Sequence, residues 1–276
     1  MKPAALSYDR PASLADALAR LAEVAGQARL IAGGQSLGPM LNFRIVRPDH
    51  LLDISRIDDL RGAGRAADVL VIGACVTHAE IEDGRIPDVA RGLLPFVAQQ
   101  IAYRAVRNRG TIGGSLAHAD PAADWLTTTI ALDAQVRLVG GFGERRVPVA
   151  DFVTGVMETA IREDEIIAHV VIPALSDRGR WGHAKYAKKP GDFAQSMAVA
   201  VEDPARGFAR VVLGRRAEPP VLLRATSDLI AANGAKPAAP ALRAAVEADL
   251  DAAAVDAGDR IMHRAIIERA VRGLAA

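Results

Sequence analysis

Residues 109–124 read RGTIGGSLAHADPAAD, and they carry more information about function than any other stretch of the chain. A small-residue segment with the paired glycines Gly113 and Gly114 leads directly into acidic residues and a proline. Because glycine has no Cβ, this segment can adopt positive φ and let a ligand lie on the backbone, with consecutive N–H groups facing an anion. The stretch therefore predicts a loop that binds phosphate through its main chain.

A second loop of the same character lies near the N-terminus. The sequence Ala32-Gly33-Gly34-Gln35-Ser36-Leu37 follows the short run Arg29–Ile31. Either loop alone is more often a tight turn than a ligand site, but the two together favour one ligand with two phosphates. Neither loop has the G-x-G-x-x-G or Walker spacing, so the nicotinamide-binding Rossmann fold and the P-loop fold both lack their fingerprint here.

Composition excludes several classes of partner. The 276 residues suffice for about two domains, and 50% of them are hydrophobic, which is enough for a packed core. With 34 basic residues, 33 acidic residues and 4% aromatics, the chain has neither the charge nor the stacking residues typical of nucleic-acid or anionic-membrane binding. Cys75 is the only cysteine, which predicts no internal disulfide and no cysteine-ligated iron–sulfur cluster or zinc knuckle.

A reducing, cytoplasmic location fits this cysteine content. Residues 1–26 lack the apolar region and cleavage site of a signal peptide. No run of about 18 uninterrupted apolar residues occurs, so we expect no membrane span.

Capping residues, glycines and prolines divide the first half of the chain. Ser13 is the predicted cap of a helix that Gly26 ends. Thr77 and Glu80 have capping-box spacing, and Pro87 is expected to open the next helix. The apolar face of that helix carries Val89, Leu93, Val97 and Ile101. Strands are expected at Leu30–Ala32, Leu51–Ile54 and Val69–Ile72, with a short helical piece between the first two and a hairpin around Gly62–Arg65.

The second half changes from a mixed pattern to strands followed by helices. A helix over Ala122–Leu132 and a hairpin over Gln135–Val149 precede the strand Glu165–Pro173. The polar run Ser176–Arg180 is the best candidate linker. Short strands then follow at Ala184–Lys188, Gln195–Val201 and Ala209–Leu213. Alanine-rich amphipathic helices end the pattern, around Leu242–Leu250 and Ile261–Val271.

The two carboxylates of the central stretch have two interpretations each. Both can be solvated groups at a helix start, since acidic residues favour the first turn and Pro121 marks such a start. For Asp120 we favour that interpretation. Asp124 lies ten positions after Gly114, where a carboxylate can accept hydrogen bonds from ribose hydroxyls, and the two interpretations stay open.

Other polar clusters give weaker signals. The six histidines have neither H-x-x-x-H nor H-E-x-x-H spacing, which argues against a metal site. Ser36 and Ser115 have no nearby histidine or carboxylate partner in a recognised nucleophile motif. Arg104, Arg107 and Arg109 are either a solvated face or long-range support for the charge of a diphosphate.

Three motifs together resemble a known family. They are AGGQS at residues 32–36, TIGGS at 111–115 and KKPGDFA at 188–194. In this order and spacing they are similar to the FAD-binding medium subunits of the molybdenum hydroxylases, the family of carbon monoxide dehydrogenase flavoproteins and bacterial xanthine dehydrogenase FAD subunits. The resemblance covers essentially the whole chain.

The resemblance implies a set of cofactor-binding residues. The two glycine motifs would hold the FAD diphosphate, Asp124 the adenosine ribose, and Ile167 would lie near the flavin ring or the adenine. Lys185, or the pair Lys188–Lys189, would approach the isoalloxazine from the second domain. Leu30 and Leu37 would pack on the cofactor beside the first motif, whose residues are Ala32, Gly33, Gly34, Gln35 and Ser36, and the second motif would contribute Thr111, Gly113, Gly114 and Ser115.

The resemblance also implies a fold and a role. The expected fold is α+β: a two-part FAD-binding domain of the vanillyl-alcohol-oxidase (PCMH) type over residues 1–174, then a small antiparallel-sheet-plus-helices domain over 181–276. Partner chains would be a molybdopterin-binding large subunit and a small subunit with [2Fe–2S] clusters, in a dimer of heterotrimers. This chain would pass their electrons from FAD to an external acceptor. The alternatives are a stand-alone FAD-dependent oxidase or dehydrogenase, and a structural subunit that has lost its flavin.

Overall fold

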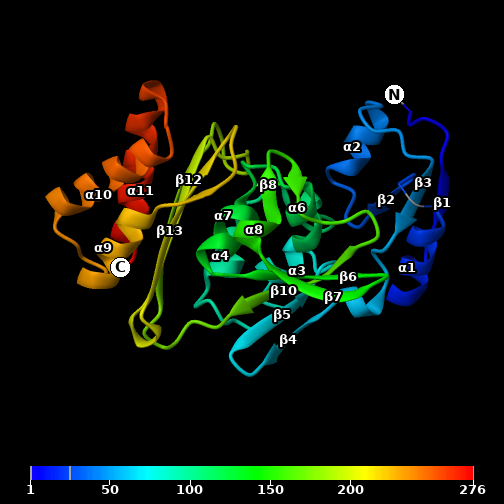
Figure 1. Cartoon of the computed structure of the whole chain (residues 1–276), viewed down its shortest axis with the longest axis horizontal. Coiled ribbons are helices and arrows are strands. Elements are labelled where there is room, and N and C mark those ends of the chain that lie inside the picture. The colour runs from blue at the N-terminus through cyan, green and yellow to red at the C-terminus, as the bar shows by residue number, and fades with distance from the viewer. Residues whose placement is uncertain (1, 25, 276) are drawn as a thin grey trace.

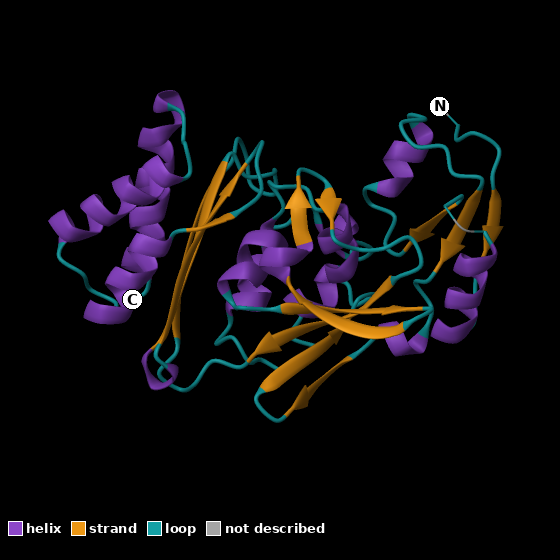
Figure 2. Cartoon of the chain, in the orientation of Figure 1, coloured by secondary structure: helices purple, strands orange, loops and turns teal. Residues whose placement is uncertain are grey.

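The computed structural model describes residues 2–24 and 26–275 of the chain. Its three main sheets follow one another across the molecule, from the N-terminal sheet at the right of Figure 1 to the C-terminal sheet and helices at the left. Helices lie between the sheets and outside them (Figure 2). This mixed arrangement confirms the predicted α+β class.

The first sheet is small and parallel. Its strands, in the order β1-β3-β2, are Ser7–Asp9, His50–Asp53 and Ala28–Ile31. Helix α1 (Leu14–Glu23) packs on it, and the Ser13 hydroxyl caps that helix by accepting a hydrogen bond from the Asp16 N–H at 3.1 Å, as predicted. The chain leaves β2 through the first glycine motif and forms the short helix α2 (Leu37–Asn42) before it returns as β3, which confirms the expected order.

The second sheet has five strands, each antiparallel to its neighbours. In the order β4-β5-β10-β6-β7 they are Ala63–Ala66, Val69–Gly73, Ile166–Pro173, Gln135–Gly140 and Gly143–Pro148. The predicted hairpin β6–β7 is confirmed, and the predicted strand β10 is the central one. Short elements connect these strands: η1 (Asp58–Leu60), α3 (His78–Glu82), α4 (Leu93–Gln99), α5 (Arg104–Arg107), α6 (Ile112–His118), α7 (Asp124–Ala131), α8 (Val149–Phe152), β8 (Val153–Gly155) and β9 (Glu158–Thr159).

The third sheet lies between two layers of helix. Its antiparallel strands are β11 (Arg180–Tyr186), β12 (Ser196–Asp203), β13 (Phe208–Arg215) and β14 (Val221–Leu222), with the turn η2 (Pro204–Arg206) between β12 and β13. One face packs on α9 (Arg224–Asn233), α10 (Ala239–Ala252) and α11 (Ala257–Gly273). The other face packs on α7, so that Val199, Val201 and Val212 share a core with Trp125. No described helix is both long and apolar enough to cross a bilayer.

This shared core bears on the domain division. Ser176–Arg180 connects β10 to the start of β11, as a linker would. The buried valines of the third sheet nevertheless belong to the same apolar cluster as the helices of the preceding part. The division into residues 1–174 and 181–276 therefore stays a prediction.

Two predicted elements near the middle of the first half are wrong in position. Pro87 does not open a helix: α4 begins only at Leu93, because Asp88 accepts hydrogen bonds from the Ala90 and Gly92 N–H groups, and φ is positive at Arg91 and Gly92. The hairpin predicted around Gly62–Arg65 turns later, at Ala67–Asp68, so that most of the predicted turn lies in β4.

Glycine allows the third sheet to approach α11. A Cβ on Gly182 of β11 would overlap the backbone carbonyl oxygen of Ala270, which leaves no room for any other residue. Gly258, near the start of α11, has open space around its Cα instead. An alanine at Gly182 therefore tests the cost of lost close packing, and an alanine at Gly258 tests the effect of helix propensity alone.

We expect Gly182→Ala to lower the free energy of unfolding by about 2–3 kcal/mol, because a backbone atom cannot move aside as a side chain can. Gly258→Ala should leave it unchanged or raise it by about 0.5 kcal/mol. Thermal unfolding of both variants and the wild type measures the difference. Equal midpoints for the two variants would contradict the packing role of Gly182.

The buried His78 and the partly buried His183 predict a pH dependence of stability. Burial, followed by the charge of Arg107, lowers the pKa of His78 to about 4, and burial with the charge of Lys185 lowers the pKa of His183 to about 4. In the unfolded chain both titrate near pH 6.5. As the pH falls below about 6.5, the unfolded state takes up protons that the folded state does not, so stability decreases until about pH 4.

For each histidine the expected loss between about pH 7 and pH 5 is about 2 kcal/mol. Chemical denaturation at a series of pH values measures it, and His183→Gln should reduce the slope by the contribution of that ring. A stability that stays constant across this range in the wild type would show that the rings are protonated in the fold.

Candidate functional site

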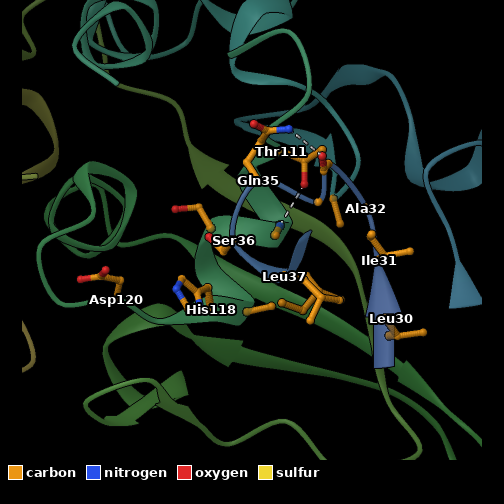
Figure 3. Close-up of a pocket in the computed structure, with 18 of the residues that line it drawn as sticks. Leu30, Ile31, Ala32, Gln35, Ser36, Leu37, Thr111, His118 and Asp120 are labelled. Atoms are coloured by element: carbon orange, nitrogen blue, oxygen red, sulfur yellow. Dashed lines mark hydrogen bonds between the residues drawn. The ribbon is translucent and has the colours of Figure 1, made fainter. Parts of the chain in front are cut away.

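A cavity of about 750 Å³ lies where the first sheet, the second sheet and the segment between β11 and β12 meet. Its walls come from the turn after β2, from helix α6 and from strand β10, with the segment Gly191–Phe193 at one end. Figure 3 shows Leu30, Ser36 and Thr111 around it, on elements far apart in the sequence. The fold therefore brings the two glycine motifs to one cavity, as the sequence predicts.

The first motif is fixed in place by a backbone contact with the segment before the second. A Cβ on Gly33 would overlap the carbonyl oxygen of Arg109, and it would lie 2.8 Å from the Cα of Gly110. Gly34 has a φ of +70°, which a residue with a side chain rarely adopts. Glycine is therefore required twice in this turn, once for a close approach and once for its conformation.

This turn has backbone N–H groups without a protein partner at the cavity wall. In the part of the chain that the structure describes, the N–H groups of residues 33–36 donate to no protein acceptor. Gln35 binds the turn itself, through a hydrogen bond of 3.2 Å from its Nε2 to the Gly33 carbonyl (Figure 3). Successive free N–H groups in a concave turn are a typical binding site for phosphate oxygens.

The second motif differs from the loop that the sequence predicts, because its glycines lie in helix α6. Their N–H groups are already bonded: Gly113 N–H donates to the Ala74 carbonyl at 3.0 Å, and Gly114 N–H donates to the Thr111 hydroxyl at 3.0 Å. A Cβ on Gly113 would overlap Ala74. Gly113 therefore serves close packing of α6 on the second sheet, and the prediction of free N–H groups at these two glycines is wrong.

The second motif still forms a wall of the cavity. Gly114 is exposed there, and the absence of a side chain leaves the α6 backbone accessible to a ligand. Of the predicted cofactor residues, all except Lys185 line the cavity: Leu30, Ala32, Gly33, Gly34, Gln35, Ser36, Leu37, Thr111, Gly113, Gly114, Ser115, Asp124 and Ile167.

Lys185 reaches the site through Asp124. The Lys185 ammonium lies 2.8 Å and 3.0 Å from the two Asp124 carboxylate oxygens, and both side chains are more than nine-tenths buried. Burial raises the pKa of the Asp124 carboxyl, and the ammonium of Lys185 opposes that rise. The pair joins the first residue of α7 to strand β11, so it also connects the two parts of the chain beside the cavity.

The remaining charged candidates fall into two groups. Asp120 lines the cavity, and its Oδ1 accepts a hydrogen bond from the Ala122 N–H at 2.9 Å, which is the local turn role favoured from sequence. Arg104 and Arg107 form ion pairs with Glu82 and Asp83, so their charges are matched on the surface and do not support a diphosphate. Of the two interpretations of this cluster, the ion pairs favour the solvated face for Arg104 and Arg107.

The pair Lys188–Lys189 is exposed and does not line the cavity. The motif that contains it contributes instead through its last residues, because Gly191, Asp192 and Phe193 form part of the wall. A hydrogen bond from the Ala102 N–H to the Gly191 carbonyl, at 3.0 Å, holds this segment beside the cavity.

Several wall residues were not identified from the sequence. Cys75, Met157, Ile161 and Arg162 line the cavity from segments without any motif. Burial raises the pKa of the Cys75 thiol to about 12, which keeps it protonated and unreactive. No periodicity or spacing marks these residues, because only the packing of β5 and the segments around β8 and β9 brings them to the cavity.

The arrangement suits a long ligand with a central diphosphate. Unpaired main-chain N–H groups, a bare glycine surface and hydroxyl groups on Ser36, Thr111 and Ser115 surround a mainly apolar cavity. Bases and rings can pack on Leu30, Leu37 and Ile167, and the Asp124 carboxylate lies in the wall as the partner of Lys185. Among the described residues these features fit an FAD molecule, whose diphosphate would meet the turn after β2.

Comparisons with known proteins agree with this fit. Residues 4–175 match the family model described as the FAD-binding domain in molybdopterin dehydrogenase. The medium chain of carbon monoxide dehydrogenase from Hydrogenophaga pseudoflava is 37% identical over 201 residues, which are 73% of this chain and 70% of that protein. The medium subunit of nicotine 6-hydroxylase from Paenarthrobacter nicotinovorans is 35% identical over 73% of this chain and 70% of its own length.

Solved structures extend the similarity to the whole chain. A chain of carbon monoxide dehydrogenase from Hydrogenophaga pseudoflava superposes with a TM-score of 0.90 at 32% identity, covering 100% of this chain and 99% of that one. A chain of quinoline 2-oxidoreductase from Pseudomonas putida 86 gives 0.88 at 34% identity, covering 100% and 98%. This chain therefore belongs to the family of FAD-binding subunits of the molybdopterin dehydrogenases.

Proposed function

We propose that the chain is the electron-exit subunit of a multi-chain molybdenum hydroxylase. It would hold FAD, accept electrons from the iron–sulfur clusters of a small partner chain and pass them to an external acceptor. A large partner chain with molybdopterin would oxidise the substrate, and two such heterotrimers would pair. The cytoplasmic location expected from the cysteine content belongs to this proposal.

The cavity is the observation that carries the proposal. Both glycine motifs line it, together with Asp124 and Ile167, in a chain whose family is FAD-binding. The relatives described above are named as medium chains or subunits, a name that implies further chains beside them. With Cys75 as its only cysteine, this chain cannot supply the four thiolates of an iron–sulfur cluster, which fits clusters held by a partner.

The residues would divide the work of holding the cofactor. Free N–H groups of residues 33–36 would bind the diphosphate, and the hydroxyls of Thr111 and Ser115 would approach it from α6. Asp124 would accept hydrogen bonds from the ribose, beside the Lys185 ammonium, which opposes the rise in the carboxyl pKa that burial causes. Leu30, Leu37 and Ile167 would exclude water from the rings. When bound, FAD supplies the redox chemistry, and the chain binds and orients it.

We expect Gly33→Ala to reduce FAD occupancy at least about tenfold, because an added methyl group would push the turn away from Arg109 and misplace its N–H groups. Gly38→Ala is the matched control, since Gly38 lies one turn later with open space around it. Flavin absorbance per protein after purification measures occupancy, and circular dichroism checks that both variants fold. Full occupancy in folded Gly33→Ala would contradict the assignment of this turn.

The proposed subunit roles predict that electrons reach the FAD from a partner iron–sulfur chain. Native purification should recover this chain with molybdopterin-containing and iron–sulfur chains, and anaerobic addition of the reduced iron–sulfur chain should bleach the flavin of the FAD-loaded chain. Turnover of a small organic substrate by the isolated, FAD-loaded chain would favour the stand-alone oxidase or dehydrogenase. A purified complex that contains no flavin would favour the structural subunit.

A further inference from the structure

A second cavity, of about 400 Å³, lies on the third sheet, where β11 begins and β12 ends. Its walls include Arg178, Arg180, Glu202, Ala231 and Gly234. Lys185, which marks the cofactor site, lies toward the other end of β11, and none of these five residues lines the large cavity. The proposed flavin function therefore does not use this second cavity.

Glu202 is a buried carboxylate with an unused oxygen. The residue is 5% exposed, and its Oε2 has no hydrogen-bond partner among the residues that the structure describes. Burial raises the pKa of the Glu202 carboxyl, while the charges of Arg180 and Arg178 oppose that rise. A buried polar group normally has a partner, because leaving it unpaired costs about 1–3 kcal/mol. Because Glu202 lines the cavity, its unpaired carboxylate points to a donor group that comes from outside the chain.

The expected protein partner of Glu202 does not pair with it. Arg180 lies directly opposite Glu202 in the β11–β12 register, where oppositely charged residues commonly form a cross-strand pair. Both Arg180 and Arg178 are exposed, and within residues 2–24 and 26–275 neither forms an ion pair. Two guanidinium groups are thus available at the rim, close to a carboxylate in the wall.

The end of helix α9 adds to the negative side of the cavity. The last carbonyl groups of a helix lack intrahelical partners and carry partial negative charge. Ala231 and Gly234, in the last turn of α9 and just after it, line the cavity, and Gly234 lies beside the Glu202 Oε1. A cationic group next to Glu202 would therefore be favoured by both the carboxylate and the helix end.

We propose that this cavity binds a small zwitterion of the α-amino-acid class. Its ammonium group would donate to the Glu202 carboxylate beside the end of α9, and its carboxylate would pair with Arg180 and Arg178 at the rim. Each unpaired charge of the cavity then has a partner, and the bipolar arrangement selects against ligands that carry only one of the two groups.

Calorimetric titration of the full-length chain with L-alanine tests the site. Propionate and ethylamine serve as half-ligands, since each lacks one of the two charged groups of L-alanine. We expect saturable binding of L-alanine to the wild type and at least about tenfold weaker binding of either half-ligand. Failure of L-alanine to bind, or propionate binding as tightly as L-alanine, would overturn the proposal.

Variants locate the binding within the cavity. Glu202→Gln keeps the shape of the side chain, and it should weaken L-alanine binding at least about tenfold. Arg180→Gln, as a separate variant, should weaken it by at least the same factor. Arg216→Gln is the control, because Arg216 is an exposed arginine just after β13 that does not line this cavity. Flavin occupancy should be the same in all three variants, which separates this site from the proposed function. Unchanged affinity in folded Glu202→Gln would overturn the assignment.

Discussion

The cofactor cavity depends on backbone contacts that only glycine permits. Gly33 packs against the carbonyl of Arg109, and Gly113 packs against Ala74, so the first sheet, α6 and the second sheet meet without intervening side chains. At each of these points an added Cβ would overlap a neighbouring atom. The position of the free N–H groups after β2 thus follows from a contact with a segment some 75 residues later in the chain.

Helix α7 links the cavity to the C-terminal part. Its first residue, Asp124, pairs with Lys185 of β11, while Trp125 belongs to the core that also contains Val199 and Val201 of β12. A buried ion pair contributes little net stability, since desolvation offsets attraction, but removal of one partner leaves an unpaired buried charge. The pair therefore serves mainly to fix the relative position of α7 and β11 at the edge of the cavity.

Much of the fold and the cavity could be predicted from the sequence because the signals are local. Ser13 and the Thr77–Glu80 capping box mark helix starts correctly, and the glycine motifs identify the cavity. What failed depends on tertiary contacts. The turn at Asp88 makes α4 begin later than predicted. The second glycine motif does line the cavity, but Gly113 packs within a helix and does not offer the free N–H group that the sequence predicted. The ion pairs of Arg104 and Arg107 with α3 and the residue after it could not be seen in sequence either.

The construction of the cavity couples cofactor binding to the fold. Its walls come from the first sheet, α6, β10 and the segment before β12. The first sheet belongs to one apolar cluster, α6 belongs to another, and β10 contributes residues to both. A ligand that binds only when all of these walls are in place stabilises the whole assembly by mass action, beyond any single contact. Since the free N–H groups of the turn after β2 have no protein acceptor, the bound diphosphate would also complete hydrogen bonds that the chain alone leaves open. The fold and its proposed cofactor therefore depend on each other at the same few glycines.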